Sequence, residues 1–397
     1  MTADIQKKVV IVGGGAGGIS VAARLCKAIN PQDIAIIEPS ETHDYQPMFT
    51  LVGGGVVKKE PYRRPEKNYI PSGVEWVHDG AATFHPENNQ LKTVGGKTIG
   101  YDYLVAAPGI QLNWGDVKGL KESVGQGAVV SNYSYDTVDS TWQALQNHKG
   151  GTAIFTMPAG MIKCPGAPQK IMWLAEEYFR KHGVRKDSEV IFATAGAGMF
   201  GVPRYREPLD VLVKQRGVTA LFGHNLIEVD AKNKTATFEK MDTKEKVVKS
   251  FEMIHVTPPQ SAPDFVKKSP LAGETGWISV DQYTTRHTKY PNVFSLGDAS
   301  SMPCSKTAAA IRKQAPVLVE NLVKVMRGGE PTALYNGYAS CPLVTSYNKV
   351  IMAEFGYEGK IMETFPFAQN RELRSMYFVK RFAFPILYWD FMLKGRA

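Results

Sequence analysis

Two of the four cysteines in this 397-residue chain have the surroundings that thiol chemistry needs. Cys164 and Cys341 lie far apart in the sequence, and each is followed directly by a proline. Cys164 also follows Lys163 and precedes an expected helix from Pro168. A positive side chain and a helix N-terminus both favour the thiolate, which is the nucleophilic form of cysteine. The pattern predicts either a redox-active pair or two unrelated half-buried thiols, and both interpretations stay open at this point.

The other cysteines and the histidines carry weaker signals. Cys26 stands among alanine and leucine residues, as expected of a small buried hydrophobic side chain. The four cysteines contain no CxxC pair, which argues against a zinc ribbon and a local redox dithiol, and they are too few for a disulfide scaffold. The eight histidines show no ligand spacing, so no metal site is predicted.

The elements that must position the thiols begin with a dinucleotide-binding unit. An apolar run at 8–12 ends in a GxGxxG motif, an amphipathic stretch follows, and a second apolar run at 34–37 ends at an acidic residue. In such a βαβ unit the glycines allow a tight turn, close approach of a pyrophosphate and close helix packing, while the acidic residue accepts hydrogen bonds from ribose hydroxyls. The predicted cofactor-binding residues of this unit are Gly13, Gly15, Ala16, Gly17, Gly18 and Glu38.

A second glycine motif, at 196–201, lacks the context that a nicotinamide dinucleotide needs. Pro203 stands two residues after its last glycine, where a long crossover helix should already run. The next expected strand, at 218–222, is followed by Gly223 and His224 instead of ending in an acidic residue. This part of the chain is therefore predicted to be a second Rossmann-like lobe without a functional NAD site.

Two further segments extend the pattern. One strand-like run ends in Ala-Pro-Gly at Gly109, and another ends in Gly-Asp at Asp298. Together with the glycine-rich start, they resemble the three signatures of two-dinucleotide-binding-domain flavoproteins. That resemblance implies an α/β fold of tandem Rossmann-like domains in which Asp298 binds the ribityl chain of FAD. It also implies a discontinuous FAD-binding domain at 1–112 plus 283–330, a second Rossmann-like domain at 113–282, and a C-terminal region at 331–397.

Five segments point to one branch of that superfamily. Residues 38–47, 163–172, 255–259, 305–310 and 341–345 together resemble sulfide:quinone oxidoreductases of the two-cysteine eukaryotic type, a branch also found in bacteria. The resemblance covers nearly the whole chain. Other branches carry a third cysteine before the first redox cysteine, and no cysteine lies between Cys26 and Cys164 here.

The resemblance also implies individual roles. Further FAD contacts match Gln46, Ala81, Gly109 and Lys306. Phe355 matches a position near the quinone, although a place in the core is the alternative for its ring. A solvated position at the start of a helix is the alternative for Lys306.

A reaction sequence follows from the same resemblance. Cys164 and Cys341 face the flavin, joined at rest by a disulfide or a bridging sulfur. Hydrosulfide attacks one sulfur, so that Cys341 carries a persulfide and Cys164 becomes a thiolate. Two electrons pass to FAD and then to ubiquinone or menaquinone, while the sulfane sulfur goes to sulfite, glutathione or another sulfide. Cys304 is either a surplus thiol or an auxiliary sulfur acceptor.

The charge and the C-terminus fit an enzyme that works at a membrane surface. The formal charge is +9, and residues 371–397 mix cationic with aromatic side chains, a combination that suits the bilayer interface. Pro385 predicts two short helices there, and a helix packed on the protein itself is the alternative. No apolar stretch is long enough to span a bilayer, and no secretory signal is expected. We therefore expect a peripheral protein of the bacterial cytoplasmic membrane or the mitochondrial inner membrane.

Other functions compete with this one. A type II NADH:quinone oxidoreductase shares the fold, FAD and membrane attachment, but it needs a nicotinamide site that the second glycine motif does not provide. A flavin-containing binding or sensor protein would show no change in its flavin spectrum when sulfide is added. Nucleic-acid binding, which the charge alone allows, has no recognised basic-aromatic module to support it, so none is expected.

Overall fold

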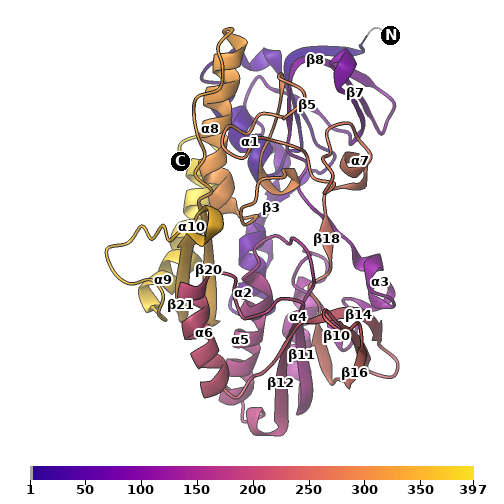
Figure 1. The fold of residues 1–397 in the computed structure, drawn as a ribbon, viewed down its shortest axis with the longest axis vertical. Coiled ribbons are helices and arrows are strands. Elements are labelled where there is room, and N and C mark those ends of the chain that lie inside the picture. The colour runs from indigo at the N-terminus through magenta and orange to yellow at the C-terminus, as the bar shows by residue number, and fades with distance from the viewer. Residues whose placement is uncertain (1–2) are drawn as a thin grey trace.

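A computed structural model describes residues 3–397. Two α/β lobes lie one above the other along the long axis of the molecule (Figure 1). Each lobe is built on its own sheet, and a two-stranded ribbon connects them. This ribbon pairs β9 (Gln111–Leu112) antiparallel with β18 (Gln260–Ser261). The chain therefore crosses from one lobe to the other at two points that lie side by side.

The first lobe has a seven-stranded sheet with the order β5-β2-β1-β8-β7-β6, and β19 also pairs with β8. The central strands run parallel, whereas β7 is antiparallel to both of its neighbours. Its strands are β1 (Ile5–Val12), β2 (Ile34–Ile37), β5 (Glu75–Val77), β6 (Ala81–His85), β7 (Gln90–Thr93), β8 (Thr98–Ala106) and β19 (Val293–Ser295).

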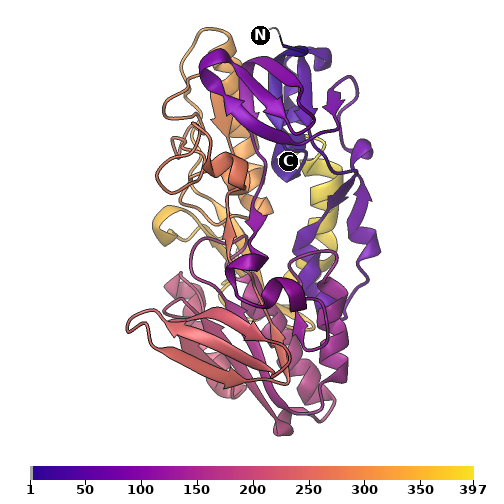
Figure 2. The same cartoon turned by 90° about the vertical axis from the view of Figure 1, so that its right-hand side faces the viewer.

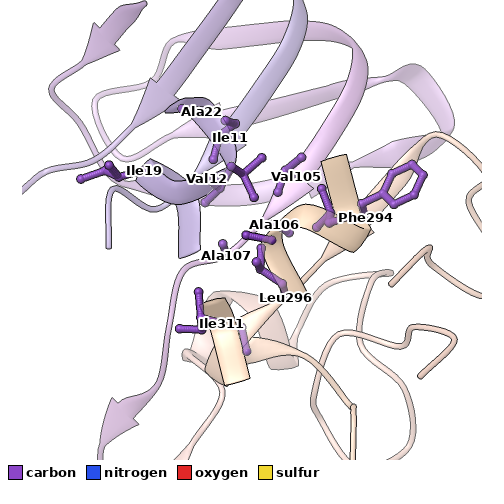
Figure 3. Packing of buried hydrophobic residues seen from close by; sticks show 14 of the residues in the cluster. Ile11, Val12, Ile19, Ala22, Val105, Ala106, Ala107, Phe294, Leu296 and Ile311 are labelled. Atoms are coloured by element: carbon purple, nitrogen blue, oxygen red, sulfur yellow. The ribbon is translucent and has the colours of Figure 1, made fainter. Parts of the chain in front are cut away.

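The core of this lobe explains the apolar run at 8–12. Residues 9–12 of β1 are buried, because a parallel strand in the middle of a sheet is covered on both faces. Helices α1 (Ala16–Leu25) and α8 (Ala308–Met326) pack against each other beside this sheet. Figure 3 shows side chains of β1 and β8 meeting side chains from residues 294–311. Early and late parts of the chain thus share one core.

The second lobe has a five-stranded parallel sheet with the order β10-β17-β11-β12-β13, and an antiparallel sheet of β14, β15 and β16. Its strands are β10 (Val129–Val130), β11 (Gly151–Met157), β12 (Ser188–Thr194), β13 (Thr219–Phe222), β14 (His224–Asp230), β15 (Thr235–Lys240), β16 (Lys246–Ser250) and β17 (Met253–His255). Its main helices are α4 (Val138–Asn147), α5 (Ala167–Lys181) and α6 (Pro203–Gln215). Pro203 is the first residue of α6, where its missing N–H group is tolerated.

Smaller elements complete the two lobes. The remaining short elements before the C-terminal region are α2 (Phe49–Gly53), α3 (Leu120–Ser123), α7 (Asp264–Lys267), β3 (Thr42–Asp44) and β4 (Arg63–Pro65). β3 pairs antiparallel with β4. In the C-terminal region, β20 (Ala339–Ser346) and β21 (Lys349–Phe355) form an antiparallel hairpin, and α5 packs against β20.

The chain ends in one continuous helix, called here the C-terminal helix, over residues 374–392. It consists of α9 (Arg374–Phe378), a π-helical turn (Val379–Ala383), α10 (Phe384–Ile386) and a second π-helical turn (Leu387–Met392). The prediction of two helices separated at Pro385 is wrong. Wide turns on both sides of Pro385 accommodate a ring that a regular α-helix would not. Figure 2 shows this helix, in yellow, beside N-terminal segments of the first lobe. Within residues 3–397, no helix combines the length and apolarity that a bilayer crossing requires.

Candidate active site

One cavity of about 520 Å³ lies where segments from the whole chain meet. Its wall includes the glycine-rich turn after β1, the end of β2, the start of α5, the segment before α8 and part of the C-terminal helix. Most of the predicted site residues line it, namely Gly13, Gly15, Ala16, Gly17, Glu38, Gln46, Gly109, Cys164, Asp298 and Lys306. The fold thus brings together residues that the sequence keeps far apart.

Four predicted site residues are not part of the cavity wall. Gly18 lies behind the turn, Ala81 is half-buried against the core of the first lobe, and Cys341 is buried one layer behind Cys164. The ring of Phe355 is buried and packs edge-on against Phe200, with ring centroids 5.7 Å apart. The proposed roles of Ala81 and Phe355 stay predictions.

The glycine-rich turn has the geometry that a bound pyrophosphate needs. Gly13 adopts φ +100°, and a Cβ atom there would lie 2.3 Å from the carbonyl oxygen of Ala107. A Cβ atom on Gly18 would lie 1.8 Å from the carbonyl oxygen of Gly13, whereas one on Gly15 would meet no atom within 4 Å. Gly13 and Gly18 therefore serve packing, and Gly15 leaves open space at the N-terminus of α1, where an anion is favoured.

The two sulfur atoms of the predicted pair lie close together. Sγ of Cys164 is 3.1 Å from Sγ of Cys341, which is fully buried on β20. Cys164 has φ +50°, and its N–H donates to the carbonyl oxygen of Lys306 at 2.9 Å. Because a disulfide bond measures about 2.05 Å, the thiols need to approach by only about 1 Å to form one. This backbone hydrogen bond ties Cys164 to the segment before α8, which also lines the cavity.

The surroundings of the pair place the negative charge on Cys164. The Cys341 thiol donates to Sγ of Cys164 and so lowers the pKa of Cys164, against the opposing effect of burial. Nζ of Lys170, 3.2 Å from Sγ of Cys164, lowers the same pKa further. The pKa of Cys341 is raised well above its usual value by that same contact and by burial. The pair can therefore hold one thiolate, on Cys164, and one proton, on Cys341.

The structure places two lysines of the site: it contradicts the predicted role of Lys163 and excludes the alternative of a solvated Lys306. Lys163 does not support the thiolate, because its Nζ donates to Oε1 of Gln46 and, at 3.3 Å, to the carbonyl oxygen of Tyr133. Lys306 is not a solvated side chain at a helix start. It is buried, its Nζ donates to the carbonyl oxygen of Ser300 at 3.0 Å, and it lies 4.1 Å above the ring centre of Trp277.

Comparisons with known proteins assign the family. Residues 7–140 match the family described as pyridine nucleotide-disulphide oxidoreductase. The mitochondrial sulfide:quinone oxidoreductase of Dictyostelium discoideum is 50% identical over 392 residues, which cover 98% of this chain and 86% of that protein. The chain belongs to the sulfide:quinone oxidoreductase family. The mouse mitochondrial sulfide:quinone oxidoreductase (Mus musculus) is 47% identical over 395 residues, which cover 99% of this chain and 88% of that protein.

Membership of the sulfide:quinone oxidoreductase family agrees with the fold. The X-ray structure of the Aquifex aeolicus sulfide:quinone oxidoreductase aligns with a TM-score of 0.81 at 19% identity and covers 98% of this chain and 91% of that one. The predicted α/β class with tandem Rossmann-like sheets is confirmed, and so is the predicted oxidoreductase family.

A flavin cofactor, which this family implies, fits the residues present. Gly15 leaves the N-terminus of α1 open. Glu38, at the end of β2, accepts hydrogen bonds from the N–H groups of Gly14 and Ser40, both at 2.7 Å. Oε1 of Glu66 is buried in the same wall without a hydrogen-bond partner among the described residues. Burial raises the pKa of Asp298 at the other side of the cavity. These groups suit the phosphates and hydroxyls of a dinucleotide.

The sequence did not reveal several residues of this cavity. Lys170 stands in the first turn of α5, where the helix dipole disfavours a cation. A lysine at such an unfavourable position is the feature of the sequence that could have pointed to a role for Lys170. The face of the C-terminal helix that carries Lys380, Phe384 and Tyr388 also lines the cavity. Their spacing marks one face of a helix only if the helix continues past Pro385. His43 and Glu66 carried no signal, because each stands alone in a loop-like sequence.

Proposed function

We propose that the protein oxidises hydrogen sulfide with Cys164 and Cys341 and passes the electrons through FAD to a membrane quinone. The observation that carries this proposal is the pair itself. The two sulfurs lie 3.1 Å apart, and the one favoured as a thiolate, Sγ of Cys164, lies at the wall of a cavity that begins at a dinucleotide-binding turn. A cysteine pair at this position can exchange sulfur with sulfide and pass electrons to a cofactor bound in the cavity.

The residues of the pair divide the chemistry between them. In the oxidised enzyme a disulfide joins the two cysteines. Hydrosulfide attacks Sγ of Cys341, the new S–S bond forms as the disulfide breaks, and Cys164 leaves as the thiolate beside Lys170. A leaving thiolate with a lowered pKa makes this exchange fast. An acceptor nucleophile then takes the outer sulfur from Cys341, and the two thiolates re-form the disulfide when two electrons leave.

The cofactor would occupy the cavity described above. A bound FAD supplies two-electron redox chemistry between the thiolates and the quinone. The residues of the cavity wall that would hold it are Gly13, Gly15, Ala16, Gly17, Glu38, Gln46, Gly109, Asp298 and Lys306. Gly18 would support the turn from behind, and a contact of FAD with Ala81 stays a prediction. Those residues fall in the segments 1–112 and 283–330, which we propose as the FAD-binding domain, with 113–282 and 331–397 as the second Rossmann-like domain and the C-terminal region.

The C-terminal helix supplies a surface for the membrane that holds the quinone. Phe378, Phe382 and Ile386 follow one another at intervals of four residues and are 62%, 47% and 55% exposed. The opposite face is buried against the first lobe, as the alternative of a helix packed on the protein itself predicted, and the exposed face is the part that we propose for the membrane. We propose peripheral attachment to the mitochondrial inner membrane or the bacterial cytoplasmic membrane, with ubiquinone or menaquinone as electron acceptor and sulfite, glutathione or sulfide as sulfur acceptor.

The test compares two electron donors. Anaerobic addition of sulfide to the purified protein should bleach the flavin absorbance, and a soluble quinone should restore it. Addition of NADH should leave the absorbance unchanged, because β13 is followed by Gly223 and His224 and offers no acidic residue for a nicotinamide ribose. Bleaching by NADH but not by sulfide contradicts the proposal and favours a type II NADH:quinone oxidoreductase.

A further inference from the structure

A buried chain of three side chains connects the cavity to the C-terminal helix. Nδ1 of His43 lies 3.1 Å from Oε2 of Glu66, and Nε2 of His43 lies 2.6 Å from the hydroxyl oxygen of Tyr388. All three side chains are more than nine-tenths buried, and all three line the cavity. They come from β3, from the residue after β4 and from the C-terminal helix, so the chain joins segments that are far apart in the sequence.

The chain of side chains ends at Glu66, which has one carboxylate oxygen without a hydrogen-bond donor among the described residues. This oxygen is Oε1, which is buried. It lies beside the glycine-rich turn, because a Cβ atom on Gly14 would be 2.6 Å from it. An unpaired buried carboxylate oxygen is unfavourable, and a ligand hydroxyl at this position would pair it.

The location of this acceptor indicates which hydroxyl would pair it. Glu38, the residue expected to bind the ribose, meets the same turn, and each of its oxygens already accepts a backbone N–H group. Both carboxylates therefore face the region where the adenosine ribose of a dinucleotide is expected. A ribose offers two hydroxyl donors, so each carboxylate can accept one of them.

The two hydrogen bonds of the chain can both run from Tyr388 toward Glu66. Burial raises the pKa of Tyr388 well above its usual value, so its hydroxyl keeps a proton that it can donate to Nε2 of His43. In that arrangement the imidazole hydrogen is on Nδ1 and is donated to Oε2 of Glu66. A ligand hydroxyl would donate to Oε1 of the same carboxylate, so that Glu66 is held between the ligand and His43.

The helix end of the chain is a packed aromatic cluster. The ring of Tyr388 lies 4.4 Å from that of Tyr45, and the ring of Trp389 lies 5.4 Å from that of His43. The guanidinium of Arg64 stacks 4.4 Å above the Trp389 ring. The inner face of the C-terminal helix is therefore docked on the same segments that form the adenosine side of the cavity.

We propose that Glu66 binds a hydroxyl of the adenosine ribose of the bound dinucleotide and that His43 and Tyr388 couple this contact to docking of the C-terminal helix. This inference rests on the proposed FAD cofactor. Glu66 is the binding residue, and His43 and Tyr388 position it. Since coupling between two sites is reciprocal, bound FAD strengthens helix docking, and a docked helix slows FAD release.

A double-mutant cycle on the FAD-bound full chain tests this coupling. The variants are Glu66→Gln, Tyr388→Phe and their combination. Tyr377→Phe is the matched control, because Tyr377 is buried on the same helix and its hydroxyl makes no hydrogen bond to His43, Glu66 or Tyr388. FAD release is followed as the appearance of free flavin fluorescence after dilution. Helix docking is followed as hydrogen exchange of the amides at 384–392.

We expect Glu66→Gln to speed FAD release by about tenfold and Tyr388→Phe by about fivefold, since each weakens a buried hydrogen bond. Both variants should exchange faster at 384–392, and Tyr377→Phe should match the wild type. The double variant should release FAD no faster than Glu66→Gln alone, because residues that act through one chain are not additive.

Three outcomes overturn the proposal. One is a double variant in which the two effects multiply, as for independent packing defects. Another is a Tyr388→Phe variant that matches Tyr377→Phe in FAD release while sulfide still reduces its flavin, which overturns this inference alone. The third is a purified chain that binds no flavin, which overturns the proposed function together with it.

Discussion

Nζ of Lys170 lies 3.2 Å from Sγ of Cys164, across the first turn of α5. The same sulfur lies 3.1 Å from Sγ of Cys341. Sγ of Cys164 is therefore in contact with both an ammonium group and a thiol. Both contacts lower the pKa of Cys164. The cation that matters for this thiol thus comes from the helix that follows it and not from the neighbouring residue.

Replacement of this cation should change the pH dependence of the first chemical step. Lys170→Met raises the pKa of Cys164, because the buried thiolate loses a charged hydrogen-bond donor worth about 1.5–3 kcal/mol. A thiolate forms as the pH rises through its pKa, so the loss should be greatest at low pH and should shrink as the pH increases. Because the pKa of Cys164 is about 5 in the wild type, we expect alkylation of Cys164 in the reduced protein to slow by about tenfold at pH 5 and by no more than about threefold at neutral pH.

The control keeps the charge. Lys170→Arg should retain most of the alkylation rate, and FAD content should be equal in both variants. Each variant is compared with the wild type at the same pH, so that any effect of pH on the alkylating reagent itself cancels. Equal pH profiles for Lys170→Met and the wild type would contradict the assigned role of Lys170.

The two cysteines should both be needed for reduction by sulfide. Cys164→Ser and Cys341→Ser each remove one atom of the sulfur pair and leave the glycine-rich turn intact. We expect flavin bleaching by sulfide to be lost in both, with FAD still bound. Cys26→Ser is the matched control, because Cys26 ends α1 away from the cavity wall. Near-normal turnover in either variant of the pair refutes the mechanism.

Two substitutions in the glycine-rich turn should separate an effect on FAD binding from an effect on the stability of the fold. In Gly15→Ala the new methyl group meets no protein atom and Gly15 has φ −67°, so the free energy of unfolding without cofactor should change little while FAD binding falls. In Gly18→Ala the methyl group meets a backbone oxygen at 1.8 Å, so the fold itself should be destabilised, by about 1–3 kcal/mol. Thermal unfolding and FAD content, measured on both variants, check this difference. Equal losses of stability would contradict it.

Local patterns predicted the elements of the site well. The strand, turn and helix around Gly13 to Gly18, and the acidic end of β2, follow from periodicity and from the special backbone freedom of glycine. Cys164 and Cys341 were singled out because each is followed by a proline and Cys164 precedes a helix start, which are features of the local sequence. Such features depend on residues that are close in the chain.

The contacts between segments could not be predicted in the same way. Lys170 contacts Cys164 across the first turn of α5, next to a backbone turn with φ +50° at Cys164, whereas Nζ of Lys163 donates to Gln46. Lys380 enters the cavity because π-helical turns carry the C-terminal helix through Pro385. His43, Glu66 and Tyr388 meet only after β3 and that helix are packed together. Tertiary packing decided each of these.

The exposed face of the C-terminal helix gives the last prediction. Phe378 and Phe382 are exposed, lie side by side with ring centroids 4.9 Å apart, and point away from the buried face that carries Lys380. If this face enters the bilayer interface, each ring is removed from water on binding. That removal contributes about 25 cal/mol of binding free energy per Å² of apolar surface. We expect Phe378→Ser and Phe382→Ser each to weaken partitioning onto anionic liposomes by about fivefold, and together by the product of the two effects.

A control on the other lobe makes this test specific. Val248 on β16 is 60% exposed, and β16 lies on the opposite side of the molecule from the C-terminal helix (Figures 1 and 2), so Val248→Ser removes exposed apolar surface without touching the proposed membrane face. Its partitioning should equal that of the wild type, measured by flotation with liposomes. Turnover with a long-tail quinone in those liposomes should fall in step with partitioning for the phenylalanine variants. Unchanged flotation of the double phenylalanine variant would show that the membrane meets another surface of the protein.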